Sequence, residues 1–122
     1  MRLPLIAIAS VCMTGVTPAC VAAHARLLRA DPPVSGAVRG VPKMLRITFS
    51  EPLVLSFSGI EVEDAAGRAV PSGKAALDPK DNRVLVYPLK TSLGPGLYTV
   101  RWRAVSADTH RTQGTYAFRI IP

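Results

Sequence analysis

The strongest constraint on the fold is an alternation of apolar and mostly polar residues in the last third of the chain. It covers residues 98–104 and returns in residues 116–120. Its apolar members are Tyr98, Val100, Trp102, Ala104, Tyr116, Phe118 and Ile120. Side chains two residues apart lie on the same face of a strand. The pattern therefore predicts two partner strands, each with one buried face.

Shorter segments of the same kind occur earlier in the chain. Residues 44–49, 60–63 and 83–89 alternate or are rich in apolar residues, residues 24–30 form an opening segment, and residues 68–70 predict a brief return strand. Proline and glycine separate these segments at intervals typical of strands, and Pro52 indicates an edge or a bend. We therefore expect an all-β domain of about seven strands, a Greek-key β-sandwich, with a small closed barrel as the alternative.

Residues 1–23 have the features of a cleaved export signal. Arg2 precedes an apolar run from Leu3 to Val16, and small residues lead up to His24. The run is too short for a transmembrane helix, which needs about 20 residues. Cleavage before His24 leaves 99 of the 122 residues as one domain, residues 24–122. Lipidation at Cys20 is an alternative, although Thr17 stands where such signals usually carry leucine.

Removal of this signal changes what the remaining chain can do. Both cysteines, Cys12 and Cys20, lie within it, so the mature domain would have neither a disulfide nor a thiolate metal ligand. The net charge falls only from +7 to +6, because Arg2 is the sole charged residue removed. The basic residues are scattered and no aromatic-rich RNA motif accompanies them, which argues against nucleic-acid binding. Weak attraction to an anionic membrane remains open.

Two histidines carry the candidate chemistry of the mature domain. His24 would be its first residue, and an N-terminal histidine offers an α-amine and a ring nitrogen to one metal ion. Asp108 and His110 are one residue apart, so an extended backbone would place both side chains on one side, about 6 to 7 Å apart at Cα. Nitrogen and oxygen ligands in a tetragonal arrangement suit Cu(II). The simpler interpretation is a loop aspartate beside a solvated histidine, with Glu51 as a turn residue and Trp102 as a core aromatic.

Several longer segments resemble the CopC copper-resistance domain. They are HARLLRADPPVSG from His24, ITFSEPL from Ile47, LGPGLYTV from Leu93 and YTVRWRAVSADTHRTQGTYAFRI from Tyr98. The resemblance spans most of residues 24–122. It implies an Ig-like or cupredoxin-like sandwich that binds one Cu(II) ion.

The same resemblance also suggests which residues bind copper. It implies that His24, Asp108 and His110 are the ligands, with Glu51 added in some members. Some members also have a methionine-rich loop for Cu(I), whereas Met44 is the only methionine after residue 23. Thioether ligands select Cu(I), so we expect a Cu(II) site alone.

Three classes of function remain to be compared. The first is a periplasmic, monomeric Cu(II)-binding protein without catalytic residues, which sequesters copper or delivers it, with a CopD-type membrane transporter as the implied partner. The second is a copper oxidase of the lytic polysaccharide monooxygenase type. A carboxylate ligand at Asp108 argues against that enzyme, because it would occupy a coordination position that oxygen chemistry needs. The third is a metal-free Ig-like interaction module, which the strand pattern alone would satisfy.

Overall fold

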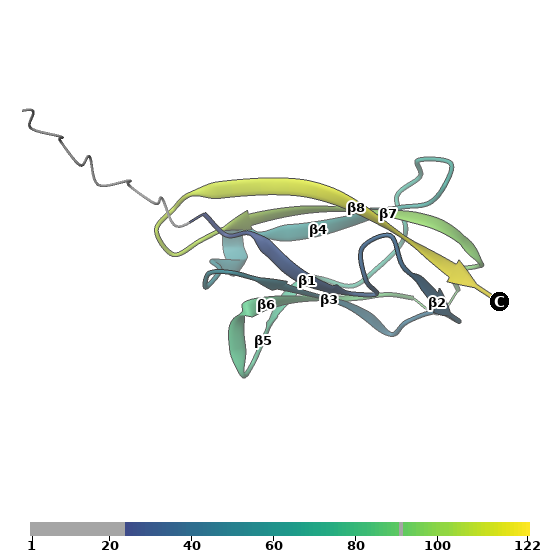
Figure 1. Ribbon diagram of the computed structural model, residues 1–122, viewed down its shortest axis with the longest axis horizontal. Coiled ribbons are helices and arrows are strands. Elements are labelled where there is room, and N and C mark those ends of the chain that lie inside the picture. The colour runs from purple at the N-terminus through teal and green to yellow at the C-terminus, as the bar shows by residue number, and fades with distance from the viewer. Residues whose placement is uncertain (1–23, 91) are drawn as a thin grey trace, which may run out of the picture.

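Two β-sheets lie face to face in the computed structural model, which describes residues 24–90 and 92–122 (Figure 1). The elements in chain order are β1 (Leu27–Asp31), β2 (Ala37–Arg39), β3 (Met44–Phe49), the 3₁₀ turn η1 (Leu55–Phe57), β4 (Gly59–Glu63), β5 (Ala76–Asp78), β6 (Asp81–Pro88), β7 (Gly96–Val105) and β8 (Arg111–Ile121). In these residues no helix is long and apolar enough to cross a membrane. The predicted signal peptide lies outside the described residues.

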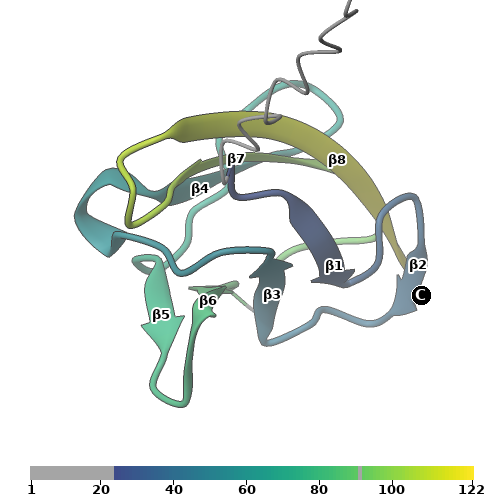
Figure 2. The ribbon, with the colours of Figure 1, turned by 60° about the vertical axis from the view of Figure 1, so that its left-hand side comes forward.

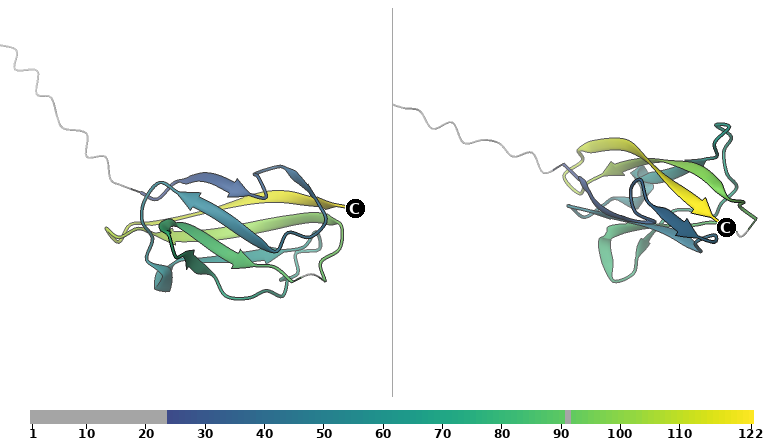
Figure 3. Two further views of the ribbon diagram at one scale, coloured as in Figure 1. Left: turned by 90° about the horizontal axis from the view of Figure 1, so that it is seen from below. Right: turned by 45° about the vertical axis from the view of Figure 1, so that its right-hand side comes forward.

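The strand order shows a sandwich rather than a closed barrel. One sheet has the order β1-β3-β6-β5 and the other β2-β8-β7-β4, so the chain passes repeatedly from one sheet to the other (Figures 2 and 3). All pairs are antiparallel except β2 with β8. The predicted all-β sandwich is confirmed, with eight strands in the described residues instead of about seven. The additional strands are short: β2 and β5 have three residues each.

The predicted return strand at residues 68–70 is reduced to one isolated bridge, between Glu63 and Ala69. The Asp64 carboxylate accepts hydrogen bonds from the backbone N–H groups of Ala66 and Arg68. Gly67 follows with a positive φ of 79°. The turn closes a short hairpin, in which the Asp64 N–H donates to the Arg68 carbonyl at 2.9 Å and the Val70 N–H donates to the Val62 carbonyl at 2.8 Å.

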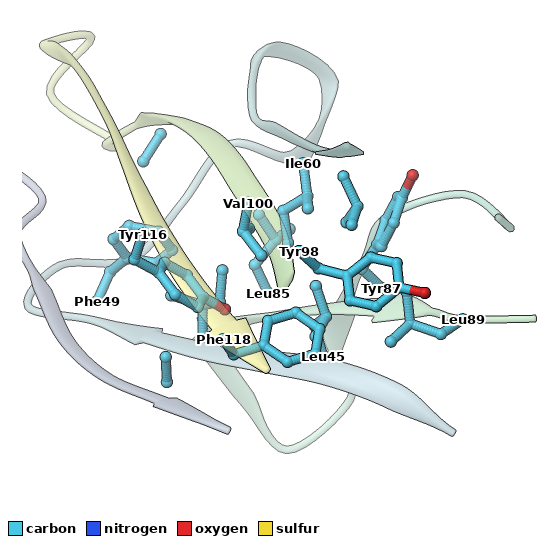
Figure 4. Packing of buried hydrophobic residues seen from close by; sticks show 14 of the residues in the cluster. Leu45, Phe49, Ile60, Leu85, Tyr87, Leu89, Tyr98, Val100, Tyr116 and Phe118 are labelled. Atoms are coloured by element: carbon cyan, nitrogen blue, oxygen red, sulfur yellow. The ribbon is translucent and has the colours of Figure 1, made fainter. Parts of the chain in front are cut away.

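The core fills the space between the sheets with the alternating apolar residues (Figure 4). Phe49 and Phe118 are fully buried, and Tyr116 is 6% exposed. Trp102 is only partly buried, and its ring meets that of Phe49 edge to face at 5.2 Å. Each such buried side chain stabilises the fold by about 1.5 to 3 kcal/mol. The predicted core placement is therefore confirmed for Tyr116, whereas Trp102 is partly buried and packs against the core.

One end of the sandwich brings together segments that are far apart in sequence. β3 ends there at Phe49, which pairs with Leu27 near the start of the described chain. β7 also ends there, and Val105 pairs with Arg111 across the β7–β8 loop. The C-terminus lies at the opposite end (Figure 1). We call the first end the open end, defined by residues 24–26, 50–54 and 106–110.

Candidate metal centre

The segment that carries His24 is held by hydroxyl groups from both sheets. After β3, Ser50 Oγ accepts a hydrogen bond from the Arg26 N–H at 2.8 Å and donates one to the His24 carbonyl at 3.2 Å. From β8, Thr112 Oγ1 donates to the carbonyl of Ala25 at 2.7 Å, and Ala25 is fully buried. These contacts fix residues 24–26 across the gap between the sheets.

The β7–β8 loop brings Asp108 and His110 together by a route other than the predicted one. We expected an extended backbone, but residues 107–108 form a turn and Thr109 has a left-handed φ of 71°. The loop is closed by backbone hydrogen bonds from Thr109 to Ser106 at 2.8 Å and from Ser106 to His110 at 3.1 Å. The predicted convergence is nevertheless present, because His110 Nδ1 lies 3.0 Å from Asp108 Oδ2.

The Asp108 carboxylate is kept ionised by its neighbours. Its Oδ1 accepts a short hydrogen bond from Ser106 Oγ, and its Oδ2 faces the His110 ring. The first of these contacts, followed by the second, lowers the pKa of Asp108 to about 2. Ser106 is only 2% exposed, so it is a fixed donor. An ionised carboxylate is the form that binds a metal ion.

The His24 ring completes the cluster at the open end. Its centroid lies 4.7 Å from that of His110, with the ring planes at 81°. The two rings come from segments 86 positions apart in the chain. His110 thus contacts both other candidates and links them.

The described residues contain no group of three or more His, Cys, Asp or Glu side chains arranged around one metal position. The three candidates meet instead as two pairs that share His110. The donor types still fit copper, since imidazole nitrogen and carboxylate oxygen both occur in tetragonal Cu(II) sites. Because a ring nitrogen must lose its proton to bind a metal ion, the hydrogen bond between His110 Nδ1 and Asp108 is lost if both atoms bind one ion.

Glu51 lies at the edge of this arrangement. It is half-buried in the bend after β3, and its side chain makes no hydrogen bond or ion pair with any other described residue. The backbone on either side is fixed: the Ser50 N–H donates to the Arg26 carbonyl at 2.8 Å, and the Pro52 carbonyl accepts from the Ala107 N–H at 3.2 Å. The structure therefore puts the backbone of Glu51 beside the site but shows no contact between its carboxylate and the histidines.

Comparison with known proteins identifies the family. The family model described as "CopC domain" matches residues 27–121. The chain belongs to the CopC family. It is 36% identical over 105 residues to Protein YobA of Escherichia coli (strain K12), covering 86% of this chain and 84% of that protein.

Two solved CopC-type structures have the same fold. CopC from Methylosinus trichosporium OB3b has a TM-score of 0.76 at 28% identity, over 81% of this chain and 95% of that one. PcoC, a methionine-rich copper resistance protein from Escherichia coli, has a TM-score of 0.73 at 33% identity, over 81% and 100%. PcoC is described as methionine-rich, whereas Met44 is the only methionine among the described residues of this chain.

Sequence reasoning missed three hydroxyl residues that hold the candidate ligands in this CopC domain. They are Ser50, Ser106 and Thr112. One signal was available: Thr112 is two residues after His110 at the start of a strand, on the face that Tyr116 and Phe118 also occupy. The other two depend on loop geometry that no periodicity reveals.

Proposed function

We propose that this chain is a periplasmic copper-binding protein that holds one Cu(II) ion through His24, Asp108 and His110. The observation that carries the proposal is the contact of the two imidazole rings, which lie 86 positions apart in the sequence but side by side at the open end. Membership of the CopC family supports copper as the metal.

The proposed ligand set depends on cleavage before His24. The new α-amine and the His24 ring would then bind the same ion, with His110 and Asp108 supplying an imidazole and a carboxylate. Ser50 and Thr112 hold the backbone of residues 24–26, so the amine would be presented at the open end. Glu51 is left as an additional oxygen ligand or an acceptor for bound water.

The role we propose is binding without catalysis. The protein would sequester copper or pass it to a CopD-type membrane transporter, and it would act as a monomer. A monooxygenase is disfavoured because Asp108 presents an ionised carboxylate directly beside His110. A metal-free interaction module is disfavoured because it does not explain why two histidines and an aspartate lie in contact at one end of the sandwich.

We also propose that the site is specific for Cu(II). The nitrogen and carboxylate donors suit that oxidation state, whereas Cu(I) favours thioether ligands. Met44 is 43% exposed at the start of β3 and pairs with Pro88, away from the open end where β3 finishes. A single methionine in that position does not make a second copper site.

The test compares two N-termini of the same domain. The exported protein is purified, its mass establishes the cleavage site, and its Cu(II) affinity and EPR spectrum are measured beside those of a form with one glycine before His24. We expect the extension to weaken Cu(II) binding by at least about a hundredfold, because the chelate ring is lost. Equal affinity and identical spectra for the two forms would refute the proposed ligand set.

A further inference from the structure

We propose that a cleft beside the metal centre docks an acidic, partly apolar segment of a second protein. The proposal deepens the proposed function, since the partner would be the protein that exchanges copper with this one. The docking itself needs no copper and is tested without it.

The cleft is formed where η1 packs beside the ends of β7 and β8. Its volume is about 530 Å³, within the usual range of about 300 to 1,000 Å³ for ligand pockets. Its lining includes one aromatic side chain and three side chains with N–H donors: Phe57, Arg103, Arg111 and Gln113. It is therefore a concave surface that combines an aromatic ring with hydrogen-bond donors.

Its charge is positive and largely uncompensated. Among the residues that the structure describes, no carboxylate lines the cleft. Among the described residues Arg111 makes no ion pair or side-chain hydrogen bond, and Arg103 has one ion pair, with Glu61 at 4.0 Å. Guanidinium groups with free donors favour carboxylates, which they can bind in a bidentate manner.

The apolar part of the surface argues for a polypeptide rather than a small inorganic anion. The turn η1 has no buried residue and leaves Leu55 39% and Phe57 58% exposed. A free anion would satisfy the two arginines but leave Phe57 in water. A segment that carries both carboxylates and an apolar side chain would cover both features. A flat membrane surface fits the concave shape less well.

The location links this cleft to the metal centre. Arg111 directly follows His110, and Thr112 lines the cleft while its hydroxyl holds the Ala25 carbonyl. The turn η1 and the β7–β8 loop lie at the same end of the sandwich (Figures 1 and 3). A segment bound in the cleft would thus lie against the backbone of β8 directly after His110, one of the proposed copper ligands.

The experiment uses isotope-labelled, copper-free protein and NMR titration. The probe is a short acetylated and amidated peptide in which Glu alternates with Leu, and the control peptide has Gln in place of Glu. We expect the acidic peptide to shift the amide signals of residues 56–57 and 111–113. Arg111→Glu and Phe57→Ser should each weaken binding about tenfold. Arg119→Glu, an exposed arginine near the other end of β8, is the matched control and should change it less than about twofold.

Three outcomes would overturn the proposal. The first is that the acidic and Gln-containing peptides cause the same shifts. The second is that sodium acetate at equal carboxylate concentration gives the same shifts with the same dependence on Arg111, which would make the cleft a simple anion site. The third is that phosphatidylglycerol vesicles, but not the peptide, bind in a manner that depends on Phe57 and Arg111, which would make it a membrane contact.

Discussion

The substitution Thr112→Val tests whether the hydrogen bond from the Thr112 hydroxyl to the Ala25 carbonyl supports copper binding at His24. Valine keeps the branched shape and the strand preference of threonine but cannot donate to the Ala25 carbonyl. The 2.7 Å hydrogen bond would be lost, and Ser50 alone would hold residues 24–26.

The structure sets the size of the expected effect. Ala25 is fully buried, so its carbonyl depends on a protein partner, but Thr112 is only partly buried and water can approach from its exposed side. A lost hydrogen bond costs about 0.5 to 1.5 kcal/mol, and an unsatisfied buried carbonyl about 1 to 3 kcal/mol. We expect a loss of about 1 kcal/mol. If this whole free energy is lost from the copper-bound position of His24, the Cu(II) affinity falls about fivefold.

Two measurements separate positioning from general stability. Urea unfolding of the copper-free protein gives the change in folding free energy, and Cu(II) competition with a chromogenic chelator gives the change in affinity. Thr112→Ser restores the hydroxyl and should restore the affinity, whereas Thr115→Val, at an exposed position of the same strand, should change neither quantity. Wild-type copper affinity in Thr112→Val would refute the positioning role of the Thr112 hydroxyl. So would a Thr112→Ser variant that binds copper as weakly as Thr112→Val.

Three further outcomes are expected. In copper-free protein, Ser106→Ala should raise the pKa of Asp108 from about 2 toward its usual 3.8. An NMR titration of the Asp108 carboxyl measures this shift. Because the folded-state pKa is the lower one, the stability due to ionised Asp108 is present above about pH 3.8 and lost as the pH falls toward 2. Gly114→Ala would place a Cβ 2.6 Å from the Trp102 ring and should destabilise the fold by about 1 to 3 kcal/mol in urea, unlike Gly94→Ala, which meets nothing within 4 Å. Anaerobic titration should show no Cu(I) site separate from the Cu(II) site.

The sheets could be predicted because one face of each main strand is buried. Alternation in β7 and β8 identified Tyr98, Val100, Phe118 and Ile120 as core, and all four are buried. The short strands β2 and β5 escaped prediction, since three residues are too few to show a period of two. The predicted return at residues 68–70 is present only as one bridge with two flanking backbone hydrogen bonds, because three residues after a tight turn are too few to form a longer ladder.

The proximity of the candidate residues could be predicted from residue type and spacing, but the hydrogen bonds that hold them could not. Spacing alone suggested that Asp108 and His110 converge, yet the left-handed Thr109 that brings them together leaves no mark in a hydrophobic pattern. Hydrogen bonds such as those of Ser50 and Ser106 join positions whose proximity depends on the completed sandwich. Support of this kind becomes visible only once the strand order is known.

The dispersed origin of the proposed ligands determines how copper would act on stability. The α-amine and ring of His24 belong to one residue, so this chelate would survive unfolding and bind copper in the unfolded chain as well. Asp108 and His110 join it only when β3, β7 and β8 are assembled. A ligand stabilises the folded state only by the difference between its affinities for the folded and unfolded states. The stabilisation by copper therefore measures what Asp108 and His110 add to the His24 chelate, and it is smaller than the total free energy of copper binding.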